Sequence, residues 1–266
     1  MLERIITSTA NPRVKAIARL RDRSERDTTG RFIVEGAREL ERAESAGVPL
    51  ETVALCRSLA NDADIARALS LTGGHTELLE VGEAAFRKIA YRRHPDGILG
   101  IGASWDLRLT KLELGKDPLV LVLEGVEKPG NLGAVLRTAD AAGLDAVVAA
   151  DPGTDMVNPN VIRASQGAVF NVPLATASLD DTISWCAANN LTVVAGSDDA
   201  AMCYWDASFI GSVAIVVGRE SAGIDAGWRP GSQTVRVPMH GASDSLNVAT
   251  AAALLIYEAL RQRTHA

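Results

Sequence analysis

The sequence predicts an α/β protein with two domains, a smaller N-terminal one and a larger C-terminal one built on a parallel sheet. Three observations predict this class. Short apolar runs alternate with helical segments along the chain. In the second half, runs such as 119–123 and 213–217 are continuously apolar, as expected of strands buried on both faces of a parallel sheet. Between the halves lies a polar stretch punctuated by Gly115 and Pro118.

Composition restricts the class further. The chain has 266 residues, of which 47% are hydrophobic and 23% charged, so it can bury the cores of two domains. No apolar run is long enough to cross a bilayer and the N-terminus lacks the apolar core of a signal peptide, so a cytoplasmic protein without a membrane partner is expected. Cys56, Cys186 and Cys203 are odd in number and lack C-x-x-C spacing, which predicts reduced thiols and no disulfide or metal site.

The first domain is expected over residues 1–105, followed by a linker over 106–117. Asn11-Pro12 is typical of a helix start. Alternating apolar patterns predict the other elements, which are strands over 31–35, 50–55, 76–81 and 98–103 and helices over 37–46, 65–71 and 84–89.

Basic segments stand out in the first domain because the formal net charge of the whole chain is −6. Residues 1–30 carry seven cationic and four anionic side chains, and the loop 91–97 holds Tyr91, two arginines and a histidine. This mixture suits phosphate contacts and base stacking, although an ordinary solvated surface explains each segment equally well when taken alone. The candidates for nucleic-acid contact are Arg13, Lys15, Arg19, Arg92, Arg93 and, in the second half, Arg163.

The second domain is expected over residues 118–266. Its predicted strands are 119–123, 145–150, 168–173, 191–196, 213–217 and 235–237. Helices are predicted from Asn131, from Asn158-Pro159 and over 179–189. A long C-terminal helix is expected to take Ser243, Asp244 or Ser245 as its N-cap and to end in Arg261 and Arg263.

Polar segments follow three of these strands. They are the helix start at 131–137, the loop 218–223, which has a glycine at each end, and the turn in which Ser245 and Asn247 flank Leu246. Each has an ordinary explanation as a helix cap or a surface loop. In one parallel sheet, however, the carboxyl ends of the strands meet at the same edge, where open α/β sheets bind ligands. The sequence contains no G-x-G-x-x-G after a strand and no P-loop motif, so the usual nucleotide sites are not predicted.

The three segments also resemble a known family. They read Asn131-x-Gly133-x-x-x-Arg137, Gly218-x-Glu220-x-x-Gly223 and Val237-Pro238-Met239…Ser245-Leu246-Asn247-Val248. In order, they resemble the three motifs of the SpoU or TrmH family of RNA ribose 2′-O-methyltransferases. The first half resembles, more loosely, that family's ribosomal-protein-like RNA-binding domain, through Asn11-Pro12…Lys15, Phe32-Ile33-Val34-Glu35-Gly36 and Gly97-Ile98-Leu99-Gly100. Asp96 and Val237 depart from residues common in that family, which are glutamine and isoleucine.

This resemblance implies a deep trefoil knot in the C-terminal domain, a bent S-adenosylmethionine bound in it, and a homodimer. The implied cofactor-binding residues are Gly218, Val237, Met239, Leu246 and Asn247. The implied catalytic residues are Arg137, Asn131, Glu220, Ser245 and Asn247. Arginine is almost always protonated, so Arg137 acts either as a base that has lost its proton to an RNA phosphate or as a stabiliser of a developing alkoxide.

Three functions remain open at this point. The first is ribose methylation of large-subunit ribosomal RNA, which the ribosomal-protein-like first half favours. The second is the same reaction on transfer RNA. The third is a non-catalytic RNA-binding or ribosome-assembly factor that keeps the fold. Against the third stands the complete polar set in the motifs, since a binding module has no need of all of it.

Overall fold

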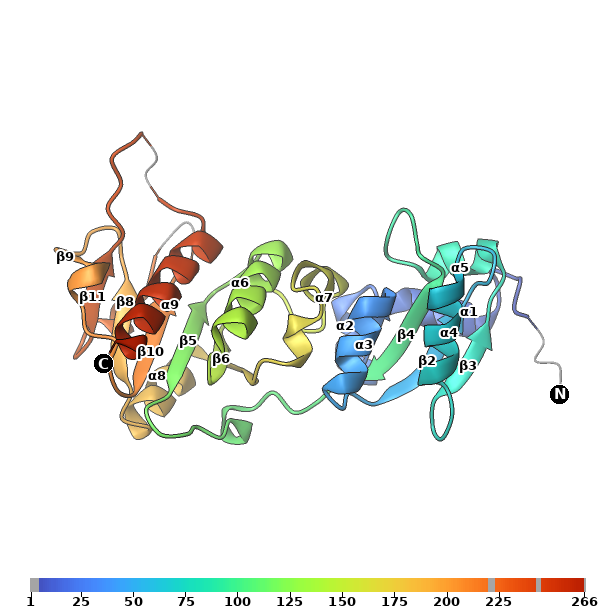
Figure 1. Cartoon of the computed structure of the whole chain (residues 1–266), viewed down its shortest axis with the longest axis horizontal. Helices are drawn as coiled ribbons and strands as arrows, with labels where there is room; N and C mark the ends of the chain where they lie inside the picture. Colours follow the sequence, from blue (N-terminus) through green and yellow to red (C-terminus); the bar gives the residue numbers. More distant parts are fainter. Residues whose placement is uncertain (1–4, 220–222, 243–244, 266) are drawn as a thin grey trace. The chain divides into compact units, whose positions relative to one another are not determined.

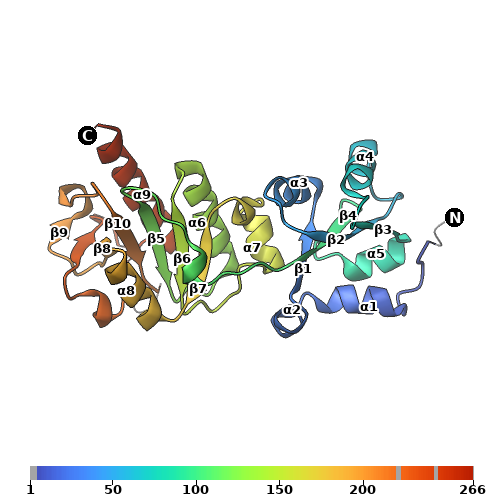
Figure 2. The same cartoon turned by 90° about the horizontal axis from the view of Figure 1, so that it is seen from below.

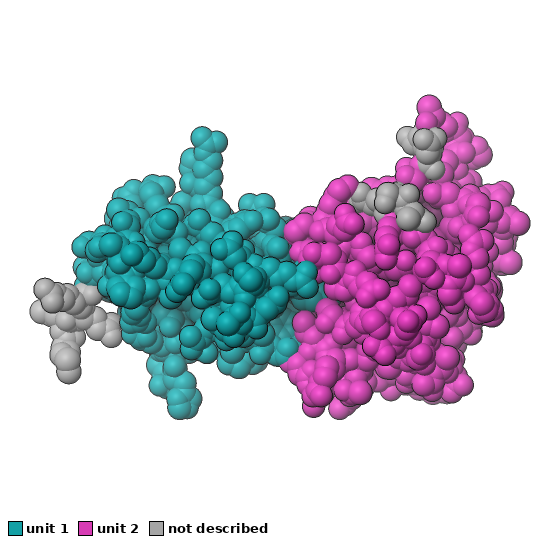
Figure 3. Space-filling model, turned by 180° about the vertical axis from the view of Figure 1, so that it is seen from behind, with its two compact units in different colours: residues 1–105, 155–171 teal, residues 106–154, 172–266 magenta. Residues whose placement is uncertain are grey.

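A computed structural model describes residues 5–219, 223–242 and 245–265 of the chain (Figure 1). The chain forms two compact units, coloured separately in Figure 3. Unit 1 comprises residues 1–105 and 155–171, and unit 2 comprises residues 106–154 and 172–266. Among the described residues, no helix is both long and apolar enough to cross a membrane.

Unit 1 is built on a four-stranded sheet with the order β1-β4-β2-β3. β4 pairs antiparallel with both β1 and β2, and β2 pairs parallel with β3. The strands are β1 Arg31–Glu35, β2 Leu50–Leu55, β3 Glu77–Glu80 and β4 Ile98–Ala103. The helices from the first 105 residues are α1 Pro12–Arg19, α2 Arg23–Thr29, α3 Ala37–Ser45, α4 Asp62–Leu71 and α5 Glu83–Ile89.

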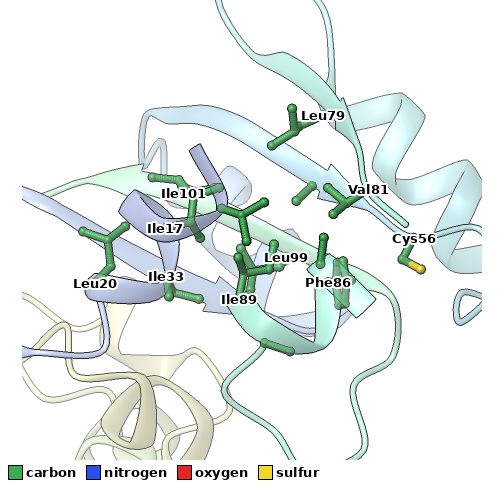
Figure 4. Close-up of a cluster of buried hydrophobic side chains, with 14 residues drawn as sticks. Ile17, Leu20, Ile33, Cys56, Leu79, Val81, Phe86, Ile89, Leu99 and Ile101 are labelled. Carbon is green, nitrogen blue, oxygen red and sulfur yellow. The ribbon is translucent and has the colours of Figure 1, made fainter. Parts of the chain in front are cut away.

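One core of unit 1 lies between this sheet and the helices α1 and α5 (Figure 4). Ile17 of α1 and Phe86 and Ile89 of α5 are buried together with Ile33 and Leu99 of the sheet. Burying apolar side chains of this size contributes roughly 1.5–3 kcal/mol each. This packing holds the basic helix α1 on the sheet.

Residues 155–171 belong to unit 1, although they follow strands of unit 2 in the sequence. They contain α7 Pro159–Ala164 and the 3-10 helix η2 Ala168–Phe170. The guanidinium of Arg26 donates to both carboxylate oxygens of Asp155 at 3.1 and 2.6 Å, and the ring of Phe170 stacks on Phe32 at 6.0 Å. The expected strand over 168–173 is wrong, because the apolar run buries its side chains from a 3-10 helix and the next strand begins only at Leu174.

Unit 2 is built on a seven-stranded sheet with the order β7-β6-β5-β10-β8-β11-β9, and every neighbouring pair in it is parallel. This confirms the parallel α/β domain expected from the sequence. The strands are β5 Leu119–Glu124, β6 Ala146–Ala150, β7 Leu174–Ala177, β8 Thr192–Gly196, β9 Met202–Cys203, β10 Val213–Val217 and β11 Gln233–Arg236. The deep trefoil knot stays a prediction from the resemblance.

Helices cover both faces of this sheet (Figure 2). They are α6 Pro129–Ala142 and α9 Val248–Thr264 on one face and α8 Leu179–Ala188 on the other. Val120 and Val122 of β5 pack with Cys186 of α8, and the alternation of the strand turns Leu121 to the opposite face. β5 is therefore buried on both sides, which explains its continuously apolar sequence.

Two sequence expectations for unit 2 change in the structure. The segment expected as a linker contains the 3-10 helix η1 Leu109–Lys111, and its Leu109, Leu112 and Leu114 pack against the core of the unit. The N-cap of α9 is Asn247, whose side-chain oxygen accepts a hydrogen bond from the Ala249 amide at 2.9 Å. Ser245 therefore precedes the helix, and the other two expected caps, Ser243 and Asp244, lie outside the described residues.

Candidate functional site

The three motif segments meet at the carboxyl edge of the sheet in unit 2. β5, β10, β8 and β11 are adjacent in the sheet and parallel, so the loops that follow them emerge at one edge (Figure 1). In register, Leu123 pairs with Val217 and Gly196 pairs with Val235. The convergence expected from the sequence is confirmed.

A cavity of about 380 Å³, called the main cavity below, lies at this edge. Its wall includes apolar side chains from the strand ends, from the turn before α9 and from α9 itself, among them Val217, Val237, Leu246 and Leu255. Its polar lining comes chiefly from the loop after β8, which supplies Ser197, Asp198 and Asp199, and from Arg219, Arg229 and Ser245. The loop after β8 has no distinguishing signal in the sequence, because short polar side chains after a strand are common in ordinary turns.

Gly218 allows the chain to turn back sharply beside this cavity. A Cβ at Gly218 would overlap the carbonyl group of Gly223. The backbones of Arg219 and Gly223 exchange two hydrogen bonds of 2.9 Å, which close the loop on itself. The second motif therefore needs glycine at its first position, because the chain approaches its own backbone closely there.

A second cavity of about 200 Å³, called the side cavity below, adjoins the main cavity. It is lined by Gly125 to Lys128, by Asn131, and by three residues that also line the main cavity. These shared residues are Gly218, Arg219 and Val248. The two cavities thus form one site with two compartments.

A direct contact joins the first and third motifs. The amide nitrogen of Asn247 donates to the side-chain oxygen of Asn131 at 3.2 Å, while the oxygen of Asn247 caps α9. One asparagine thereby fixes the start of α9 against the start of α6. The motifs are coupled by this bond as well as by the sheet.

Glu124, which had no distinguishing signal in the sequence, joins the end of β5 to the segment that follows the second motif. It ends β5 and is only 3% exposed. Its carboxylate accepts hydrogen bonds from the Asp225 amide at 2.9 Å and from the Trp228 indole N–H at 3.0 Å. A buried carboxylate with two donors is a firm anchor, so Glu124 holds the segment after the second motif against β5.

The expected site residues fall into three groups. Gly218, Val237, Leu246 and Ser245 line the main cavity, and Asn131 lines the side cavity. Met239, Asn247 and Arg137 line neither, and Arg137 lies on the exposed face of α6. Glu220 lies outside the described residues.

The expected nucleic-acid contacts in unit 1 also differ from one another. Arg13 forms hydrogen bonds of 2.7 and 2.5 Å with Glu77 and lowers the pKa of that carboxyl. Arg92 is held inside the unit by Asp96 at 2.5 Å and by the carbonyl of Glu35 at 3.1 Å. Arg93 and Arg163 are exposed, and Arg163 donates to Asn160 at 3.2 Å. Arg92 is thus partly buried and paired within the unit, which its sequence context did not reveal, and its contact with RNA stays a prediction.

Lys15 and Arg19 border a surface groove of about 650 Å³ on unit 1. The same groove is lined by Arg21 and Lys88 and, as the one acidic residue among its described lining residues, by Asp22. Arg21 is held across it, because its guanidinium donates to the carbonyls of Lys88 and Ala90. Cations from α1 and α5 therefore face one depression, which we call the basic groove.

Comparison with known proteins identifies relatives over almost the whole chain. Residues 118–257 match the model of the SpoU rRNA Methylase family, and residues 11–100 match that of the MRM3-like substrate binding domain. The 23S rRNA (guanosine(2553)-2'-O)-methyltransferase RlmP of Bacillus subtilis is 32% identical over 95% of this chain and 97% of its own length.

Solved structures agree with these relatives. A crystal structure of an RNA 2'-O ribose methyltransferase is 45% identical and covers 98% of this chain and 100% of its own, with a TM-score of 0.86. The AdoMet-bound rRNA methyltransferase from Sinorhizobium meliloti is 30% identical, covers 97% of each chain, and has the same TM-score of 0.86.

Proposed function

The chain belongs to the SpoU rRNA methylase family, and we propose that it transfers a methyl group from S-adenosylmethionine to a ribose 2′-hydroxyl of large-subunit ribosomal RNA. The observation that carries this proposal is the two-compartment site, in which the three motif segments enclose a main cavity and an adjoining basic side cavity. One compartment suits a donor and the other an acceptor. A purely RNA-binding protein has no need of an enclosed donor pocket.

The main cavity fits a nucleoside cofactor. Its volume of about 380 Å³ lies within the roughly 300–1,000 Å³ typical of small-molecule sites. Val217, Val237 and Leu246 offer apolar walls for an adenine ring, and the close turn at Gly218 exposes backbone groups to it. S-adenosylmethionine supplies an activated methyl group when bound. The protein contributes binding, orientation and the exclusion of water.

The side cavity suits the phosphate and ribose of the acceptor. Lys128 and Arg219 line it, Glu127 is the one acidic residue among its described lining residues, and Asn131 adds a polar side chain held by Asn247. Arg137 is proposed to reach the bound RNA from the exposed face of α6 and to act on the 2′-hydroxyl. It does so as a base relieved of its proton by a phosphate or by stabilising negative charge on the oxygen. Glu220, Ser245 and Asn247 are proposed to orient these groups.

The basic groove of unit 1 is proposed to bind RNA phosphates outside the reaction site. Positive charge comes from Lys15, Arg19, Arg21 and Lys88, and Asp22 is the one acidic residue in the described lining. Several cations in one groove attract a polyanion even when the protein as a whole is acidic. Since ribosomal RNA is the proposed substrate, we place the reaction in the cytoplasm, where ribosomes assemble.

A homodimer is the proposed assembly. The outer surface of α9 has an apolar groove that Tyr204, Leu254 and Tyr257 line, and Tyr257 and Trp205 are 52% and 50% exposed. Large exposed aromatic side chains are typical of association surfaces. Sedimentation should show a dimer for the intact chain and a monomer for Tyr257→Glu, because a carboxylate placed in an apolar contact is left unpaired.

A direct test incubates the intact protein with S-adenosylmethionine labelled in its methyl group and with transcribed, unmodified large-subunit ribosomal RNA. The RNA is then digested to nucleosides and separated. Label in a 2′-O-methylated nucleoside is the expected result. Label on a base, or no transfer despite binding of both substrates, would refute the proposed reaction.

A further inference from the structure

Arg219 stands at the junction of the two compartments. Of the three described residues that line both cavities, Gly218 and Val248 lack a charge, so Arg219 is the charged one among them. Its sequence position, between the two fixed glycines of the second motif, gave no reason to single it out. In the structure it is the cation placed where a bound donor and a bound acceptor would meet.

The side chain of Arg219 is positioned by its surroundings. It crosses Gly125, which has a φ of +60° and at which a Cβ would overlap the arginine side chain. Its Nε lies 3.9 Å from a carboxylate oxygen of Glu124, the anchor described above. The side chain is nevertheless 45% exposed, and its two terminal nitrogens donate no hydrogen bond within the described part of the chain. Glu124 therefore attracts the guanidinium through an ion pair, and Arg219 stays partly exposed where it lines both cavities.

We propose that Arg219 binds a backbone phosphate of the RNA and so positions the reacting nucleotide between the two cavities. This inference rests on the proposed function. A guanidinium offers two parallel N–H donors that match a phosphate, and the neighbouring Lys128 adds a second cation to the side cavity. The alternative oxyanion at this position is the carboxylate of the cofactor. S-adenosylmethionine, however, carries two positive groups for its one carboxylate, so two added cations favour the polyanionic RNA.

The test compares the intact chain with Arg219→Ala and Arg219→Lys. Arg108→Ala serves as the control, because Arg108 is an exposed arginine of unit 2 that lines neither cavity. Cofactor affinity is measured by calorimetry. Affinity for transcribed large-subunit ribosomal RNA is measured at several salt concentrations, and methyl transfer is measured as kcat and KM for that RNA.

For Arg219→Ala we expect cofactor affinity within twofold of wild type, RNA affinity about tenfold weaker, and a salt slope smaller by about 1. The KM for RNA should rise while kcat changes less. Arg219→Lys should recover part of the affinity, because it keeps the charge opposite Glu124 but loses the planar fork. If Arg219→Ala folds poorly, Arg219→Lys alone still tests the proposal, because its RNA affinity should lie below that of wild type.

Two results would overturn the inference. A loss of cofactor affinity with unchanged RNA affinity would assign Arg219 to the cofactor carboxylate, and RNA affinity and salt slope equal to those of Arg108→Ala would deny it a role in RNA binding. Both differ from failure of the proposed function, in which the wild-type protein itself would not methylate the RNA.

Discussion

At the scale of single residues, buried carboxylates organise both units. Glu35 of unit 1 is 7% exposed and accepts hydrogen bonds from the amides of Tyr91 and Arg92 at 2.6 and 3.0 Å. Its other oxygen is the buried side-chain polar atom that lacks a hydrogen-bond partner among the described residues. Glu35 thus fixes the start of the loop 91–97. Burial of its second oxygen without a hydrogen bond costs free energy of folding.

This environment predicts a pH dependence. Burial raises the pKa of Glu35 above its usual value of 4.5, while the two amide donors and Arg92 act in the opposite direction. A group with a raised folded-state pKa contributes stability that is full below 4.5 and is lost as pH rises through the folded-state value. The free energy of unfolding of wild type, relative to Glu35→Gln, should therefore fall as pH rises above 4.5. Denaturant unfolding across this range measures it, and a difference that grows with pH would contradict the assignment.

Arg137 carries the proposed chemistry, and its exposure on α6 makes its role separable from cofactor binding. Arg137→Ala should leave S-adenosylmethionine affinity nearly unchanged and reduce single-turnover methyl transfer by roughly 100-fold or more. Arg137→Lys should fail almost as badly, since it loses the planar fork. Near-wild-type transfer by the lysine variant would reject the geometric role, and near-wild-type transfer by the alanine variant would reject a catalytic role.

At the scale of elements, the spacing of apolar residues predicted the regular strands and helices, because each kind of element buries side chains at its own characteristic spacing. The strand 213–217 follows from a run that is apolar on both faces and is observed as expected. The strand over 168–173 was wrong, since a short apolar run cannot distinguish a strand from a buried 3-10 turn. The N-cap of α9 was also misplaced, because several polar residues before Val248 can cap a helix and the Asn131 contact that fixes Asn247 is tertiary.

Residues 155–171 belong to unit 1, and the ion pair between Arg26 and Asp155 joins them to its first 105 residues. This pairing of distant residues could not be predicted from a local sequence pattern. The side chains of Arg26 and Asp155 are only 2% and 13% exposed. Asp155→Ala should therefore lower the free energy of unfolding of unit 1 by about 3 kcal/mol, because it leaves a buried cation without its carboxylate. As a control, Arg67→Ala removes the more exposed pair with Glu41, for which about 0.5 kcal/mol is expected. Equal losses in the two variants would contradict this reading of the pair.

At the scale of the whole molecule, charge is distributed unevenly. The chain has a formal net charge of −6, yet cations gather in the basic groove of unit 1 and in the side cavity of unit 2. The sequence indicated the first of these through the excess of arginine before residue 30. It did not indicate the second, because Lys128 and Arg219 are distant in sequence and are brought to one cavity only by the fold of unit 2.

The expected knot comes from the family resemblance alone, since general topology rules disfavour threaded chains.

The basic groove should contribute a measurable part of RNA affinity. Replacing Lys15 and Arg19 together by alanine should weaken binding to ribosomal RNA and reduce the salt slope by about 1.5, because two phosphate contacts are lost. The matched control replaces Arg31 and Arg57, two arginines of unit 1 outside the groove that pair with Glu51 and Glu80. If both double variants changed the salt slope equally, the groove would have no special role.

The most direct measurement of the central claim maps ribose methylation in all RNA from a strain lacking this protein. We expect a 2′-O-methyl group to be missing from large-subunit ribosomal RNA of that strain, and we expect the wild-type protein, but not Arg137→Ala, to restore it. Large-subunit RNA with every ribose methyl group still in place, or a methyl group missing only from transfer RNA, would contradict it.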